Sequence, residues 1–209
     1  MDKFSYSKLL SSTHIRLLRL LPKEKDPNNI RCELFQYPLG DVSGLSPLYE
    51  ALSYVWGSKE NLQSIIVENQ SFNITRNLFT ALLHMRDDKL PRTIWVDAIC
   101  IDQESTEKER QIALMAEIFA RASRVVIWLG DAEDNSDPLE AIRVIGEKSM
   151  EPSTEEPSIT ELNQQRIPQL LERPWFQRIW VRAPSFKMLM SAAERRSRFC
   201  KKLLLPGTF

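Results

Sequence analysis

Two apolar runs, TIWVDAICI at residues 93–101 and RVVIWL at residues 124–129, decide the fold class. Their nearly continuous apolar character predicts strands that are covered on both faces, as in parallel sheets. Between them, Thr106 and Glu109 have the spacing of a capping box that opens a helix. The apolar residues of that helix recur at spacings of three and four, which predicts a buried face of Ile112, Met115, Phe119 and Ala122. Strand, helix and strand in this order predict a βαβ unit with parallel strands.

Outside this unit, the chain is typical of strands before residue 75 and of helices after residue 129. Branched or alternating apolar residues predict strands at 14–21, 30–39 and 49–56, and a hairpin with strands at 64–67 and 71–74. Thr75 is a suitable N-cap for a helix over 76–86. Further helices are expected at 138–148 and 159–171. The sequence therefore predicts an α/β fold with a parallel-sheet core and an antiparallel, hairpin-rich N-terminal part.

Composition excludes several common classes of protein. The 209 residues carry 28 Lys and Arg against 28 Asp and Glu, so bulk positive charge for specific nucleic-acid binding is absent. Six glycines are too few and too scattered to form the common phosphate-binding loops. Three cysteines and two histidines show no zinc-ligand spacing, so no metal site is expected. Without a signal peptide or a membrane-length apolar run, we expect a cytoplasmic protein with reduced thiols and no transmembrane segment.

Three polar residues stand out in the first apolar run. Asp97 is expected inside the strand, and Asp102 and Gln103 at the end of the strand, where open α/β sheets bind ligands. A carboxylate there could act as a general base or stabilise positive charge on a sugar ring. Alternatively, Asp97 accepts hydrogen bonds from a neighbouring loop and Asp102 only solvates a turn. In either case Asp97 has a defined partner, because a buried unpaired carboxylate is costly.

Five segments, taken in order, closely resemble the heterokaryon incompatibility (HET) domain of fungal proteins. They are YEALSYVWG at 49–57, IWVDAICIDQ at 94–103, ERQ at 109–111 leading to Met115, ASRVVIWLG at 122–130 and RPWFQRIWV at 173–181. The resemblance covers residues 14–181, with its core motifs at 49–181. Residues 1–13 are then an N-terminal extension, and residues 182–209 a tail.

The resemblance implies a cytoplasmic module of fungal non-self recognition that triggers regulated cell death through assembly with protein partners or with itself. No cofactor is required for that role. The family is also distantly similar to TIR domains, which have helices on both faces of a parallel sheet. Some TIR domains cleave NAD with a catalytic glutamate, so an NAD glycohydrolase is the alternative, with NAD as substrate. Its candidate residues are Asp97, Asp102, Gln103 and Glu109, with Glu117 a further candidate by position. A truncated, inactive remnant is a second alternative.

The tail differs from the rest of the chain in charge. Residues 1–181 hold 21 basic and 27 acidic side chains, whereas residues 182–209 hold seven and one, so the net charges are −6 and +6. The family motif continues after Val181 with a Gln-Glu pair, but here the sequence reads Arg182-Ala183. The tail is either weakly ordered, a basic amphipathic helix over 185–205 that contacts acidic surfaces, or a misannotated end.

Overall fold

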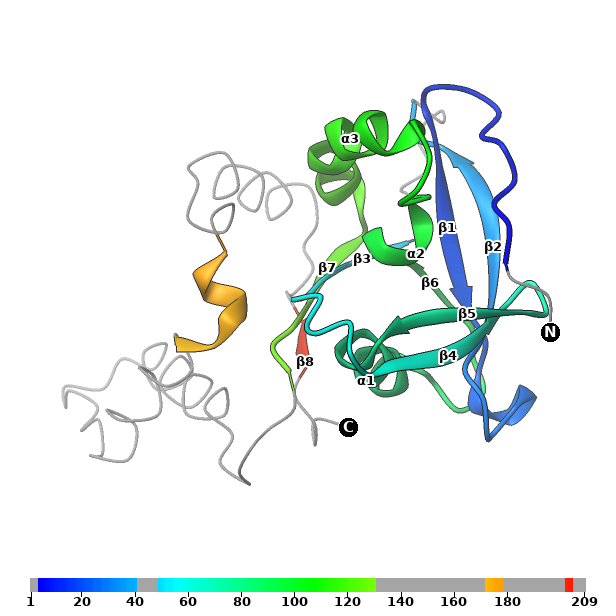
Figure 1. Ribbon diagram of the computed structural model, residues 1–209, viewed down its shortest axis with the longest axis vertical. Coiled ribbons are helices and arrows are strands. Elements are labelled where there is room, and N and C mark those ends of the chain that lie inside the picture. The colour runs from blue at the N-terminus through cyan, green and yellow to red at the C-terminus, as the bar shows by residue number, and fades with distance from the viewer. Residues whose placement is uncertain (1–3, 41–48, 131–171, 179–201, 205–209) are drawn as a thin grey trace, which may run out of the picture.

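The computed structural model describes residues 4–40, 49–130, 172–178 and 202–204 (Figure 1). Within these residues, eight strands form one sheet in the order β5-β4-β2-β1-β6-β3-β7-β8. The strands are β1 (His14–Leu20), β2 (Arg31–Pro38), β3 (Glu50–Ser53), β4 (Leu62–Val67), β5 (Gln70–Thr75), β6 (Arg92–Trp95), β7 (Arg124–Trp128) and β8 (Lys202–Leu204). The helices are α1 (Arg76–Met85), α2 (Asp97–Cys100) and α3 (Glu107–Arg121), with 3-10 turns η1 (Lys23–Lys25) and η2 (Pro174–Gln177).

The sheet has two parts that differ in strand direction. On one side β3 runs parallel to both β6 and β7, and β7 runs parallel to β8. On the other side β1 is antiparallel to β2 and to β6, and β4 and β5 form a hairpin. A short parallel contact between β2 and β4 joins the hairpin to the sheet. The predicted α/β class is confirmed, as are its parallel core and its antiparallel, hairpin-rich N-terminal part.

The hairpin and the following helix form where the sequence predicts them. Glu68 and Asn69 both have positive φ, at 49° and 63°. Two successive positive φ angles are typical of the two-residue hairpin turn whose twist matches that of the paired strands. Thr75 then caps α1, because its side-chain oxygen accepts a hydrogen bond from the Leu78 amide. The apolar side of α1 is buried in the core through Leu78, Ala81, Leu82 and Met85.

The predicted strand over 93–101 is wrong in its second half. β6 ends at Trp95, and the chain then makes the single helical turn α2. The turn is closed by hydrogen bonds from the Cys100 amide to the Val96 carbonyl and from the Ile101 amide to the Asp97 carbonyl. Ile99 and Cys100 are buried within it. A buried helical turn and a buried strand have the same apolar composition, so periodicity cannot separate them. Asp97 therefore starts a helical turn rather than lying inside a strand.

The start and the rotation of α3 also differ from the prediction. Thr106 makes no capping hydrogen bond with its side chain; the Ser105 hydroxyl accepts the Glu107 amide instead, at 3.0 Å. Ile112, expected in the core, is 48% exposed. Two polar anchors explain this rotation, since the Gln111 side chain donates to the His14 carbonyl and the Ile118 carbonyl accepts the Tyr49 hydroxyl. The other three predicted core contacts, of Met115, Phe119 and Ala122, are confirmed.

Three further predictions concern the C-terminal part of the chain. The helices expected at 138–148 and 159–171 lie outside the described residues. Within the tail, Lys202–Leu204 forms β8 and pairs with β7, so the alternative of a helix over 185–205 is wrong for these three residues. The other residues of 182–209 lie outside the described part of the chain.

Candidate functional site

The candidate site lies where the parallel strands β3 and β6 end. Tyr54 and Trp56 follow β3, and Asp97 follows β6 after one intervening residue. Because the two strands are parallel and adjacent, their carboxyl ends meet at the same edge of the sheet. Residues more than 40 positions apart in sequence are thereby placed next to one another.

Asp97 is the centre of this cluster. Its Oδ2 accepts a hydrogen bond from the Trp56 indole nitrogen at 2.9 Å, and its Oδ1 accepts one from the Ala98 amide at 2.8 Å. Burial raises the pKa of the Asp97 carboxyl above its ordinary value, against the opposing effects of these two donors and of the Arg178 charge. Asp97 therefore keeps its proton to a higher pH than an exposed aspartate does.

Tyr54 adds a buried hydroxyl beside this carboxyl. The residue is 2% exposed, and its hydroxyl has no partner at hydrogen-bond geometry within the described part of the chain. Burial raises the pKa of the Tyr54 hydroxyl, and the neighbouring Asp97 charge raises it further. Tyr54 is thus a neutral hydroxyl beside Asp97, and as a donor it opposes the effect of burial on the pKa of that carboxyl.

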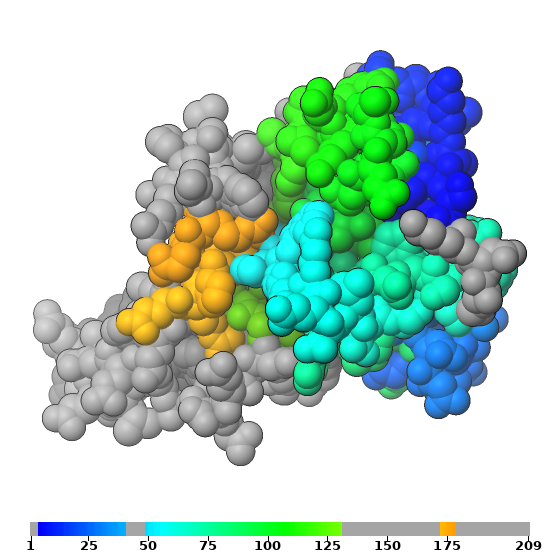
Figure 2. All heavy atoms as spheres, viewed as in Figure 1, coloured from blue at the N-terminus to red at the C-terminus, as the bar shows by residue number. Residues whose placement is uncertain are grey.

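The segment 172–178 brings Arg178 to the cluster. Arg178 donates to the Tyr54 carbonyl, and burial lowers the pKa of its guanidinium while the Asp97 charge raises it. The Trp175 indole nitrogen donates to the Ser53 hydroxyl at 3.0 Å, and its ring packs with Val125, Ile127 and Leu129. In the space-filling view, this segment lies beside residues that follow β3 and beside the end of β7 (Figure 2). Its contacts with both strands hold Arg178 at the carboxyl edge of the sheet.

Asn77, the second residue of α1, joins two more of the motifs at this edge. Its side-chain nitrogen donates to the Val55 carbonyl, and its oxygen accepts the Trp128 indole at 2.8 Å. Gly57 lies against it with a φ of 77°, and a Cβ on Gly57 would come within 3.3 Å of the Asn77 Cβ. Glycine is therefore favoured at position 57 by its positive φ, and the close approach of α1 leaves little room for a side chain there.

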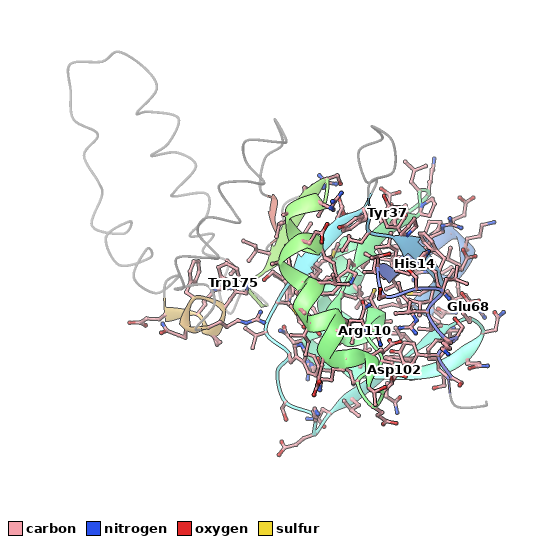
Figure 3. The ribbon with its side chains drawn as sticks, turned by 90° about the horizontal axis from the view of Figure 1, so that it is seen from above. His14, Tyr37, Glu68, Asp102, Arg110 and Trp175 are labelled. Carbon is pink, nitrogen blue, oxygen red and sulfur yellow. The ribbon has the colours of Figure 1, made fainter. Side chains whose placement is uncertain are left out.

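The four residues predicted for the site have different positions. Gln103 donates to the Asp97 carbonyl at 2.9 Å and so closes the loop that follows α2. The Asp102 backbone amide donates to Glu107, its carboxylate accepts the Glu104 amide at 3.1 Å, and Figure 3 shows Asp102 well apart from Trp175. Glu109 is exposed on α3. The structure thus brings Asp97 and Gln103 together, and places Asp102 and Glu109 outside the cluster around Asp97.

The further candidate Glu117 is also exposed on α3, where it pairs with Arg121 at 2.7 Å. Sequence reasoning named neither Tyr54, Trp56 nor Arg178 as site residues. They belong to the motifs at 49–57 and 173–181, and those motifs were the available signal. The order of the strands, which brings these motifs to Asp97, cannot be read from the motifs themselves.

A second buried polar cluster lies between β1 and the start of α3. Arg16 of β1 is 1% exposed and forms a two-pronged ion pair with Glu107 at the start of α3. Its guanidinium also donates to the carbonyls of Cys100 and Ser7. This cluster ties β1, the end of α2 and α3 together.

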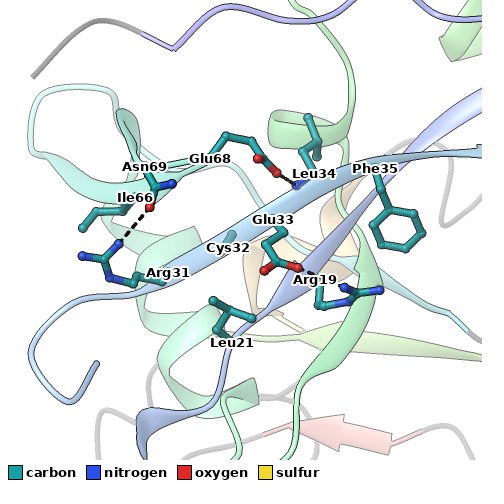
Figure 4. Close-up of a pocket in the computed structure, with 10 residues that line it drawn as sticks. All are labelled: Arg19, Leu21, Arg31, Cys32, Glu33, Leu34, Phe35, Ile66, Glu68 and Asn69. Carbon is teal, nitrogen blue, oxygen red and sulfur yellow. Dashed lines mark hydrogen bonds and ion pairs between the residues drawn. The ribbon is translucent and has the colours of Figure 1, made fainter. Parts of the chain in front are cut away.

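A hollow of about 320 Å³ lies away from Asp97, over β1, β2 and the turn that follows β4 (Figure 4). The charged side chains that line it are satisfied within the protein. Arg19 pairs with Glu33, Arg31 contacts Asn69, and Glu68 accepts the Leu34 amide at 2.7 Å. These contacts hold β2 to its neighbours, and the hollow shares no residue with the cluster around Asp97.

Two kinds of feature, a metal-ligand cluster and a membrane-length helix, are absent from the described residues. Among the described residues, no three His, Cys, Asp or Glu side chains are grouped closely enough to hold a metal ion. Of the helices in the described ranges, none has the length and apolar character needed to cross a bilayer.

Comparison with known proteins identifies relatives. The family model described as heterokaryon incompatibility protein (HET) matches residues 49–182. The chain is also similar to heterokaryon incompatibility protein 6, OR allele, of Neurospora crassa, with 30% identity over 227 aligned positions. The alignment covers 85% of this chain and 33% of the relative, so the chain spans about a third of that protein's length. No solved structure matches the chain.

Proposed function

The chain belongs to the heterokaryon incompatibility (HET) family, as its five ordered motifs predict, and we propose that this module triggers regulated cell death through protein–protein assembly. The relative is a fungal incompatibility protein by name, which supports a role in non-self recognition. One structural observation favours assembly over catalysis. Both oxygens of Asp97 already accept hydrogen bonds inside the module, so the central carboxylate of the cluster is used to join the motif at 49–57 to the motif at 94–103.

Inducible dimerisation in a fungal cell tests the assembly proposal. The chain is fused to a domain that dimerises on addition of a small molecule, and growth is scored with and without that molecule. We expect growth arrest only when the molecule is present, because proximity is the trigger. The Trp56→Phe variant, which removes one hydrogen bond to Asp97, should weaken the arrest. The Leu10→Ala variant, changed at a side chain that is 77% exposed, should behave as the unchanged chain does. Growth that is the same with and without the dimerising molecule would contradict the assembly proposal.

The second candidate function is a TIR-like NAD glycohydrolase. It is favoured by the position of Asp97 at the carboxyl ends of parallel strands, next to Arg178 and the buried Tyr54 hydroxyl. The ionised Asp97 carboxylate can stabilise positive charge on a ribose ring, and it can take a proton from water as a general base. In this proposal water attacks the ribose carbon as the nicotinamide–ribose bond breaks. Nicotinamide leaves as a neutral base with the electron pair of that bond, and the proton lost by water passes to the Asp97 carboxylate.

Purified protein incubated with NAD tests this second function by the release of free nicotinamide. If Asp97 carries the chemistry, Asp97→Asn abolishes turnover. Single changes to alanine at Asp102, Gln103 and Glu109 then measure the share of each. Absence of turnover, even when the protein is clustered by the dimeriser, would remove the enzymatic candidate and leave assembly. A chain that neither arrests growth nor cleaves NAD would be the inactive remnant.

Two further parts of the proposal rest on the resemblance and on charge. We place the module in the cytoplasm, which a fluorescent fusion followed by cell fractionation tests. Residues 182–209, with their seven basic side chains, are proposed to contact acidic surfaces. Co-sedimentation with anionic vesicles should then fall when the chain is cut after Val181, and unchanged binding would remove this role.

A further inference from the structure

The residues before β1 contact the loop that carries Asp97, although they precede the family match at 49–182. We call residues 4–13 the N-terminal strap. The Tyr6 hydroxyl donates to the Ile99 carbonyl of α2 at 2.9 Å, across 93 positions of sequence. The Arg16 guanidinium lies over the Tyr6 ring, 4.9 Å from its centroid. The strap therefore contacts both α2 and the buried ion pair beside it.

Arg16 connects the strap to the end of α2 and to the start of α3. One nitrogen donates to the Ser7 carbonyl at 2.7 Å, and the other contacts the Cys100 carbonyl at 3.5 Å. Both nitrogens contact the Glu107 carboxylate, whose Oε1 also accepts the Asp102 amide at 3.4 Å. The strap, the last residue of α2 and the first residue of α3 thus share one buried cation.

The strap is fastened to the sheet on both sides of Tyr6. On the N-terminal side, the Phe4 ring packs edge-on against Phe72 of β5, with the ring centroids 5.5 Å apart. The Tyr6 ring packs against the same Phe72 ring at 6.3 Å. On the C-terminal side, the Gln36 side chain of β2 accepts the Leu10 amide at 2.7 Å and donates to the Lys8 carbonyl at 2.9 Å. These contacts on both sides of Tyr6 restrict the position of its hydroxyl.

We propose that Tyr6 and Arg16 are positioning residues that set the geometry of Asp97. One turn of helix has no stability of its own, so outside partners must fix α2. Tyr6 and Arg16 hold the Ile99 and Cys100 carbonyls at the end of this turn. Asp97 stands at its start, where its carbonyl accepts the Ile101 amide and the Gln103 side chain. Release of the strap therefore loosens the Asp97 contact with Trp56.

The importance of this contact for activity rests on the proposed function. Its effect on the Trp56 indole can be measured whether or not that function holds. Nuclear magnetic resonance of the full chain records the Trp56 indole N–H, assigned by its disappearance in Trp56→Phe. A pH titration of this signal follows the ionisation of Asp97, its acceptor. Hydrogen exchange of the Cys100 and Ile101 amides reports the stability of the α2 turn.

The test variant is Tyr6→Phe, which removes one hydroxyl and keeps the ring, and its matched control is Tyr37→Phe. Tyr37 is also partly buried, and its ring packs edge-on against Tyr49, just before β3. We expect Tyr6→Phe to move the Trp56 signal and its titration midpoint, and to speed exchange of the two amides about fivefold, as loss of one hydrogen bond implies. Tyr37→Phe should change neither.

Two results would overturn the inference. The first is that Tyr6→Phe leaves the signal, its midpoint and the exchange rates unchanged; the second is that Tyr37→Phe changes them equally. Failure of the growth and nicotinamide assays would remove the proposed functions, but it would not alter either measurement on Trp56. The two failures are therefore distinguishable.

Discussion

At the scale of single residues, Asp97 links structure to pH. Its pKa is raised above the ordinary value of 3.8 by burial, so the folded chain holds this proton more tightly than the unfolded chain does. The resulting contribution to stability is complete at acidic pH and is lost as the pH rises through the folded pKa. The sign is opposite for Asp26, whose pKa is lowered to about 2 by its contact with Arg31.

The Asp97→Asn variant isolates this effect. Asparagine keeps an oxygen for the Trp56 indole and cannot ionise, so we expect it to remove the part of the stability that declines with rising pH. Urea unfolding of both proteins between pH 4 and pH 8 measures this difference. The variant should gain stability relative to the unchanged chain as the pH rises, and parallel pH profiles would refute the assignment.

Trp56 is expected to contribute through its single N–H donor. The Trp56→Phe variant leaves the Asp97 Oδ2 without that partner inside the protein. We expect a loss of about 1–3 kcal/mol in the free energy of unfolding, the cost of an unsatisfied buried acceptor. Leu10→Ala, at an exposed side chain, should change it by less than about 0.5 kcal/mol. Equal losses in a urea titration would contradict a specific role for the indole.

At the scale of elements, the buried ion pair between Arg16 and Glu107 anchors α3 to β1. Glu107→Gln leaves the Arg16 cation buried without its counter-charge. We expect a loss of about 3–5 kcal/mol in the free energy of unfolding, as for other broken buried pairs. Glu33→Gln breaks the half-exposed pair with Arg19 and should cost less than about 1 kcal/mol. Thermal unfolding of both variants provides the comparison.

The accuracy of sequence-based prediction also differs from element to element. The hairpin and α1 are predictable because their turn residues and caps act locally. The end of β6 is not, because the apolar run continues unchanged from the strand into α2. The rotation of α3 is set by the Gln111 contact with β1, which no helical period reveals. In the site, Asp97 and Gln103 are close in sequence, whereas Trp56 and Arg178 reach Asp97 only through the order of the strands.

At the scale of the whole molecule, the sheet crosses the boundary of the family match. β1 lies between β2 and β6, so the first 48 residues supply the middle of the sheet and not an appendage. A fragment of residues 49–182 would expose the β1-facing edge of β6 and would lack Arg16. We expect it to lack cooperative thermal unfolding, measured by circular dichroism, whereas removal of residues 1–3 should preserve the transition. A cooperative transition in the fragment would contradict this expectation.

The position of β1 also has a consequence for how the chain is made. Leu18 pairs with Ile94, so the centre of the sheet closes only after β6 has left the ribosome. Until then β1 and β2 form a ribbon with an open edge, which can pair with other nascent chains. Contacts so distant in sequence slow folding, because a long loop must close before they form. The nascent chain is therefore most prone to aggregation between the synthesis of β2 and that of β6, and this is the interval in which a chaperone would protect it.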